Sequence, residues 1–115
     1  MAEFLRIHSQ NPEMRKITSS VELLKKGGVI IYPTDTVYGI GCNPYNEHAV
    51  KKIYEIKSRA KVKSLPVLAY SLDVVKEIAL IDEFTEKIIE KNWPGPLTLI
   101  LELTDQKLKK SLKPI

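Results

Sequence analysis

The chain is poor in the residues that build disulfide frameworks, metal sites and membrane spans. Its 115 residues include one cysteine, Cys42, and two histidines, His8 and His48. One cysteine excludes an internal disulfide framework and a cysteine-rich zinc site. The histidines have no partner at metal-ligand spacing, so we expect no metal site on the protein itself. No apolar run approaches a membrane span, and residues 1–16 lack the apolar core of a signal peptide. These absences predict a soluble, cytoplasmic protein.

Glycine-rich phosphate loops are also absent. The sequence contains neither G-x-x-x-x-G-K-[ST] nor G-x-G-x-x-G, so P-loop and dinucleotide-binding sites lack support. Aromatic residues are sparse, with one Trp, five Tyr and two Phe. Reading of single-stranded bases by stacking is therefore not expected.

Positive charge is concentrated in two places. The net charge of +4 comes from the tail, because basic and acidic residues balance over 1–106. Within that balanced part, residues 51–63 carry six cations against one carboxylate, Glu55. A focused positive patch favours an anionic ligand more strongly than total charge does. The tail cations are Lys107, Lys109, Lys110 and Lys113.

Apolar periodicity and turn residues predict seven elements. Helical spacing, as for Val50, Ile53 and Tyr54, or an N-cap such as Asp82 predicts helices, and Gly27-Gly28 ends the first one. Short β-branched or apolar runs predict buried strands. The order α-β-α-β-α-α-β predicts an α/β (α+β) fold in which helices flank a twisted mixed or largely parallel sheet. Residues 104–115 start an amphipathic helix or arm, and we expect further sequence beyond them. The predicted helices are 13–26, 46–57, 72–79 and 82–91, and the predicted strands are 29–32, 65–70 and 97–103.

A loop that includes Gly39 and Gly41 is expected after the first predicted strand, and it begins with polar side chains in the stretch PTDTVYG. Ligands in open α/β sheets bind where loops leave the strands. The hydroxyls of Thr34, Thr36 and Tyr38 can orient a small polar substrate, and Gly39 and Gly41 would let the backbone approach it. The alternative is a loop whose side chains only satisfy their own backbone.

A basic segment follows the second predicted helix. Lys57, Arg59 and Lys63 lie on it, together with Lys61. Arginine grips phosphate with two parallel hydrogen bonds and lysine acts as a point charge, so the segment suits a triphosphate. The alternative is a solvated basic loop that complements a helix C-terminus.

Three motifs in order, YPTDTVYGIGC, KSR followed by KSLPVL, and WPGPLTLIL, resemble the YrdC-like family. Its best-known members are threonylcarbamoyl-AMP synthases. The resemblance runs through residues 14–103, and the start FLRIHSQNPEMRKI resembles the YciO branch. It implies a single YrdC-like domain over 1–115 whose C-terminal half, with an S-x-N motif, is absent.

The resemblance implies an ATP-dependent nucleotidyltransferase. Threonine and bicarbonate or CO2 form a carbamate, which attacks the α-phosphate of ATP and releases pyrophosphate. A transferase partner then places the threonylcarbamoyl group on adenosine 37 of tRNA. Mg²⁺ would accompany the nucleotide. The resemblance leaves two alternatives open for the 115-residue chain alone, an active protein or an inactive fragment of the domain.

The resemblance also assigns roles to single residues. Thr36 would contact threonine, with Thr34 and Tyr38 lining the pocket. Leu68 falls where many synthases carry a histidine facing threonine, which leaves open a YciO-like protein acting on a different small acid.

On the nucleotide side, Lys57 and Arg59 form the family's K-x-R pair, which would hold the ATP phosphates as the catalytic cations. Lys63 stands where many members have an asparagine near the nucleotide. The basic segment leaves a second function open, a module that binds tRNA or double-stranded RNA without its own catalysis.

Overall fold

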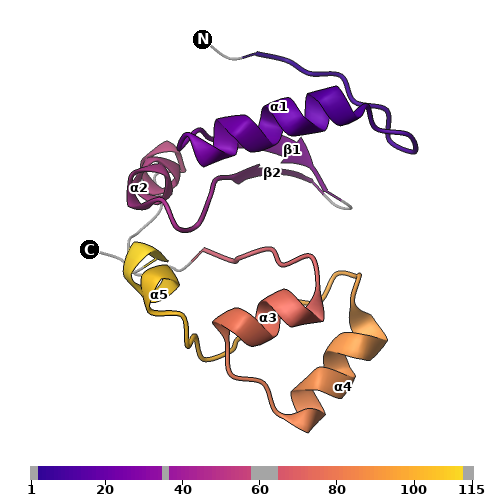
Figure 1. The fold of residues 1–115 in the computed structure, drawn as a ribbon, viewed down its shortest axis with the longest axis vertical. Coiled ribbons are helices and arrows are strands. Elements are labelled where there is room, and N and C mark those ends of the chain that lie inside the picture. Colours follow the sequence, from indigo (N-terminus) through magenta and orange to yellow (C-terminus); the bar gives the residue numbers. More distant parts are fainter. Residues whose placement is uncertain (1–2, 35–36, 58–64, 113–115) are drawn as a thin grey trace.

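The computed structural model describes residues 3–34, 37–57 and 65–112. Within these ranges the chain forms five helices and a two-stranded sheet (Figure 1), a mixed α/β architecture. None of the helices in the described ranges is long and apolar enough to cross a membrane. The elements are α1 Met14–Lys25, β1 Ile30–Pro33, β2 Tyr38–Gly41, α2 Glu47–Ile56, α3 Leu72–Ile78, α4 Glu83–Asn92 and α5 Gln106–Leu112.

Local signals placed the helices correctly. The predicted N-cap Asp82 accepts a hydrogen bond from the backbone N–H of Thr85 at 2.8 Å, and the Asn46 side chain accepts one from Ala49 at 3.0 Å. Side chains of this kind satisfy N–H groups that a helix leaves unpaired. Gly27 ends α1 with φ +86°, as its position predicts. A Cβ atom there would lie 2.7 Å from the Asn46 amide nitrogen, so the turn also passes close to the start of α2.

The first predicted strand is confirmed, but its partner was not foreseen. β1 pairs antiparallel with β2, in a register that places Tyr32 opposite Gly39 and Ile30 opposite Gly41. Residues 38–41 were expected to belong to a loop, and that expectation was wrong. Two glycines in four residues hide the alternation by which a strand is recognised, because glycine has no side chain to place on either face.

The predicted strands 65–70 and 97–103 do not join a sheet. In the described part of the chain, the latter makes an isolated bridge between Ala79 and Leu103. Half-buried and exposed residues still alternate along both segments, the pattern of an extended chain. The expected mixed or parallel sheet is therefore wrong for the described residues. Apolar composition sets an extended conformation, whereas a strand also needs a neighbouring backbone.

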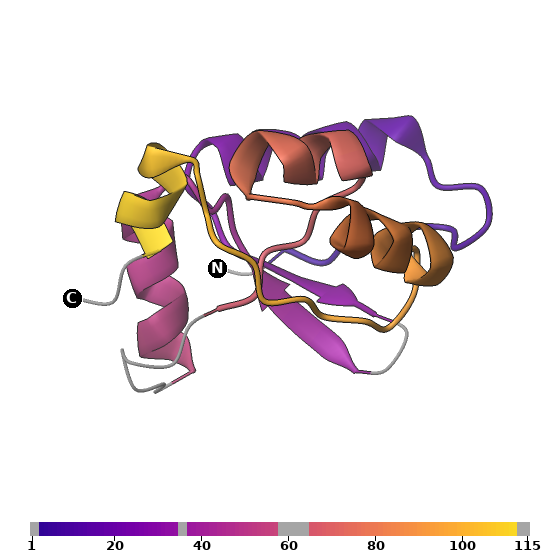
Figure 2. The same cartoon turned by 90° about the horizontal axis from the view of Figure 1, so that it is seen from below.

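Two small clusters form the core. α5 packs on α2, as both views show (Figures 1 and 2), and Leu108 and Ser111 are buried there. α2 contributes Ala49, Val50, Ile53 and Tyr54, including the face predicted from the sequence. Val75, Ala79 and Ile89 form buried positions on and beside α3 and α4. By contrast, α1 buries no residue.

Candidate functional site

The turn between β1 and β2 carries the first group of predicted site residues. Thr34 donates its backbone N–H to the Val37 carbonyl at 3.2 Å, and Val37 returns an N–H to Thr34 Oγ1 at 3.1 Å. The Thr34 hydroxyl also donates to the Val37 carbonyl. These bonds match the alternative of a loop that satisfies its own backbone, so Thr34 helps to shape the turn. Thr36 lies outside the described residues.

The two glycines of β2 make room for an aromatic ring. A Cβ atom on Gly39 would lie 3.0 Å from Tyr32 Cζ, and one on Gly41 would lie 3.0 Å from Tyr32 Cε1. The ring of Tyr32 therefore lies across this face of the hairpin. The interpretation that these glycines bring the backbone close to a ligand is corrected, because the side on which their Cβ atoms would project is already covered.

Tyr38 stands on the other face of the hairpin. Since it pairs with Pro33 and strand residues alternate, it shares a face with Ile31 and Ile40 and not with Tyr32. Its side chain is 74% exposed, and Ile31 and Val37 are each 73% exposed. The exposed ring edge and hydroxyl of Tyr38 are thus open to contact from outside the described fold.

Lys57 follows α2 directly and is the described member of the predicted phosphate clamp. Its backbone N–H donates to the Ile53 carbonyl at 3.0 Å, which closes the last turn of the helix. The residue is exposed, and a cation at this position complements the helix dipole. Arg59 and Lys63 lie outside the described residues.

The two described parts of the predicted site are not brought together. The turn end of the hairpin and α2 lie at different ends of the sheet in both views (Figures 1 and 2). Thr34 and Tyr38 belong to the former, and Lys57 to the latter. Groups of three or more His, Cys, Asp or Glu side chains that could hold a metal are also absent from the described ranges.

The packing of α5 on α2 joins two basic segments that are far apart in the sequence. We call the exposed cations of these two segments the α2–α5 lysines. One of them, Lys110, forms an ion pair with Glu47 at 3.9 Å. The sequence indicated each basic segment but not their adjacency. The α2–α5 lysines are Lys51, Lys52, Lys57, Lys107, Lys109 and Lys110.

Polar contacts hold α5 to the loop before α2. The Tyr45 hydroxyl donates to Asp105 Oδ2 at 2.6 Å, and the Ser111 hydroxyl donates to the Pro44 carbonyl. The bond from Tyr45, followed by the backbone N–H of Leu108, lowers the pKa of the Asp105 carboxyl. The same bond raises the pKa of Tyr45. Both shifts favour an ionised Asp105 carboxylate and a protonated Tyr45 hydroxyl, which are the states that this bond requires.

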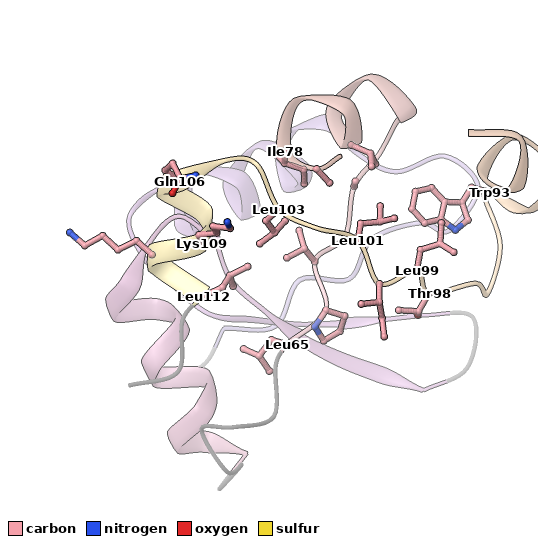
Figure 3. A pocket seen from close by; sticks show the side chains of 17 residues that line it. Leu65, Ile78, Trp93, Thr98, Leu99, Leu101, Leu103, Gln106, Lys109 and Leu112 are labelled. Atoms are coloured by element: carbon pink, nitrogen blue, oxygen red, sulfur yellow. The ribbon is translucent and has the colours of Figure 1, made fainter. Parts of the chain in front are cut away.

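An apolar groove of about 1040 Å³ lies beside the segments 65–70 and 97–103. Figure 3 shows Leu99, Leu101 and Leu103 along one of these segments and Leu65 on the other. Trp93 lies at one end, where its indole N–H donates to the Leu97 carbonyl at 2.8 Å. The sequence predicted both segments as buried strands and therefore did not predict the groove.

Comparison with known proteins gives a consistent result. The family model Sua5_yciO_yrdC, described as "Telomere recombination", matches residues 22–115. Protein YciO of Escherichia coli K12 is 32% identical over 106 residues, which cover 92% of this chain and 52% of YciO. The crystal structure of E. coli YciO matches with a TM-score of 0.84 at 27% identity, covering 99% of this chain and 68% of that one.

Relatives with a named activity or ligand are also similar. The threonylcarbamoyl-AMP synthase of Aliivibrio fischeri is 37% identical over 91 residues, 76% of this chain and 49% of the synthase. The structure of P. abyssi Sua5 complexed with L-threonine matches with a TM-score of 0.72 at 26% identity, covering 88% of this chain and 37% of that one. The chain spans about half the length of the curated relatives it matches.

Proposed function

The chain belongs to the Sua5/YciO/YrdC family, and on that premise we propose that it contributes one part of the site of a threonylcarbamoyl-AMP synthase. The reaction joins L-threonine, bicarbonate or CO2, and ATP, and releases pyrophosphate. The observation that carries the proposal is the exposed turn end of the hairpin, in a fold that matches a Sua5 structure complexed with L-threonine. Because the relatives are about twice as long, the activity is proposed for the whole family fold and not for these 115 residues alone.

On the threonine side, the turn residues would have different roles, some shaping the turn and others contacting the substrate. Thr34 holds the turn through its bonds to Val37, so its contribution is to position its neighbours. Thr36 would contact the amino acid, and the exposed hydroxyl of Tyr38 would supply a second polar contact. Short hydrogen bonds of this kind orient a small polar substrate.

On the nucleotide side, Lys57, Arg59 and Lys63 would surround the phosphates of ATP. The carbamate oxygen attacks the α-phosphorus, a new P–O bond forms, and the bond to the pyrophosphate leaving group breaks. Catalysis of such a transfer depends on holding the reactants in line and on positive charge around the phosphates. Mg²⁺ would enter bound to ATP, since phosphate oxygens and water are the ligands it favours.

The activity is tested by pyrophosphate release in the protein that carries the whole family fold. Release should require ATP, threonine and bicarbonate together, and other small amino acids offered in place of threonine report the substrate. Lys57→Ala should lower turnover by about 10²–10³, the usual cost of losing one electrostatic contact to a developing charge. The matched control is Lys52→Ala, another exposed lysine of α2 that the clamp does not use.

Nucleotide binding gives a second readout on the 115-residue chain itself. Lys57→Ala and Arg59→Ala should weaken ATP binding in equilibrium dialysis, whereas Lys52→Ala should not. If Lys57→Ala and its control Lys52→Ala behave alike in both assays, the assignment of the phosphate clamp is wrong.

A second candidate function is RNA binding without catalysis, which the α2–α5 lysines favour. Binding of tRNA or double-stranded RNA through phosphates should weaken steeply with salt. Lys107→Ala should reduce both the affinity and the salt dependence, and Lys87→Ala on α4 serves as the control. RNA affinity in a whole-fold protein that releases no pyrophosphate with threonine would favour this function over the first.

A further inference from the structure

The β1–β2 hairpin has little support from the rest of the described fold. Every described residue of β1, of β2 and of the turn between them is half-buried or exposed. The helix α1 buries none of its residues, so it does not clamp the hairpin in a core. The conformation of the hairpin therefore depends mainly on contacts between its own two strands.

The strand β2 is intrinsically weak. Two of its four residues, Gly39 and Gly41, are glycines, which lose more conformational freedom on folding than other residues and bring no side chain to pack. They lie two positions apart and so share one face of the strand. Such gaps are stabilised when an aromatic side chain of the neighbouring strand covers them.

A single ring covers both glycines. Tyr32 pairs with Gly39 in the register of the hairpin. A Cβ atom on Gly39 would lie 3.0 Å from Cζ and 3.2 Å from Cε2 of the Tyr32 ring. A Cβ atom on Gly41 would lie 3.0 Å from Cε1, on the opposite edge of the same ring. The two edges of the ring thus fill the two places where β2 has no side chain, and they hold β2 against β1.

This ordered strand leads directly to the residues of the proposed threonine side. Tyr38 precedes Gly39, lies on the face of the hairpin opposite the Tyr32 ring and is 74% exposed. The place of so exposed a side chain is set mainly by the backbone that carries it. Thr34 and Val37 close the turn through their mutual hydrogen bonds. The turn is therefore fixed at its tip by Thr34 and at its base by Tyr32.

We propose that Tyr32 is a positioning residue for the amino-acid substrate. Its ring fixes the backbone of β2, so that Tyr38 and the turn meet threonine in one geometry. The ring covers the other face of the hairpin, so it acts through these residues and not by touching the substrate. Ring carbons make the shortest contacts at both glycine positions, so the ring and not its hydroxyl carries the role. This inference rests on the proposed function, which names threonine as the substrate.

Hydrogen exchange on the 115-residue chain tests the positioning without any reaction. NMR should show that Tyr32→Ala speeds exchange of the Thr34 and Val37 amides by about tenfold or more, because the base of the turn opens locally. The amides of Ala49 and Thr85, which bond to the caps of α2 and α4, should keep their rates. Tyr32→Phe retains the ring and should exchange like the wild type.

Steady-state kinetics of the protein that carries the whole family fold test the consequence for the substrate. Tyr32→Ala should raise KM for threonine by about 10–100-fold, because misplaced contacts bind the amino acid less well. KM for ATP should stay unchanged, and Tyr32→Phe should match the wild type in both values. Phe84→Ala is the matched control, since it removes an aromatic ring that is 72% exposed on α4, away from the hairpin.

Three outcomes overturn the proposal. The first is that Tyr32→Ala leaves exchange at Thr34 and Val37 unchanged, or speeds it equally at Ala49 and Thr85, as a general loss of stability would. The second is an equal rise in KM for threonine and for ATP. The third is that Tyr32→Phe raises KM for threonine as Tyr32→Ala does, which would make the hydroxyl a substrate contact. If the wild type releases no pyrophosphate with threonine, the proposed function fails, and the exchange rates still decide whether Tyr32 positions the turn.

Discussion

Replacing Leu108 with alanine tests whether α5 is an integral part of the fold. Leu108 is 1% exposed and is the largest fully buried side chain among the described residues. It lies on α5 where that helix packs on α2. Truncation of a buried leucine costs about 2–5 kcal/mol, because the lost transfer energy adds to the cost of the cavity. The reasoning predicts a loss within that range for Leu108→Ala.

The loss should be a large share of the total stability. Domains of this length unfold with about 6–17 kcal/mol, and the described part of this chain buries only eight apolar residues. With a urea dependence of about 1–3 kcal/mol per molar, a loss of about 3 kcal/mol lowers the urea midpoint by about 1–3 M. Far-UV circular dichroism of the helices measures that midpoint.

The neighbouring residue supplies the control. Lys109 is exposed on the same helix, so Lys109→Ala keeps the helix and should change the free energy of unfolding by less than about 0.5 kcal/mol. If Leu108→Ala and Lys109→Ala unfold at the same urea concentration, α5 does not pack on α2 as described. The adjacency of the two basic segments that carry the α2–α5 lysines would then also fail.

Two further predictions concern polar and aromatic contacts. The pKa of Asp105 is lowered in the folded chain, so its bond to Tyr45 stabilises the fold above the ordinary aspartate pKa of about 3.9, and this stabilisation is lost as pH falls through the lowered pKa. The difference in unfolding free energy between wild type and Tyr45→Phe should therefore be constant from about pH 5 to 9 and shrink in acid. A difference that stays unchanged in acid would refute the coupling. Gly39→Val should destabilise the hairpin by about 1–3 kcal/mol, because the new side chain overpacks against Tyr32. In a chain that already carries Tyr32→Ala, thermal unfolding should show a smaller loss of stability from Gly39→Val. Equal losses with and without Tyr32→Ala would exclude the ring as the cause.

The sequence located the turn that carries Thr34 and Tyr38, but not the contacts that these residues make. The stretch from Thr34 to Tyr38 was recognised from its hydroxyls and from the strand before it, and the structure places the described residues of this stretch at an exposed turn. The use of the Thr34 hydroxyl within the turn was one of two open alternatives, and only the position of Val37 decided between them. The role of Gly39 was misread, because the ring that needs the space comes from the opposite strand.

The sequence by itself determined the helices α1 to α4, the N-cap of α4 at Asp82 and the end of α1 at Gly27. These features depend on residues within one or two turns of each other, so local side-chain chemistry is sufficient. It also determined that 65–70 and 97–103 are apolar and extended. Only the tertiary structure decided that they join no sheet within the described chain beyond the bridge between Ala79 and Leu103, that α5 packs on α2, and that a groove stays open. Those outcomes depend on contacts between segments far apart in sequence, and a strand or a packed helix exists only where such a neighbour is present.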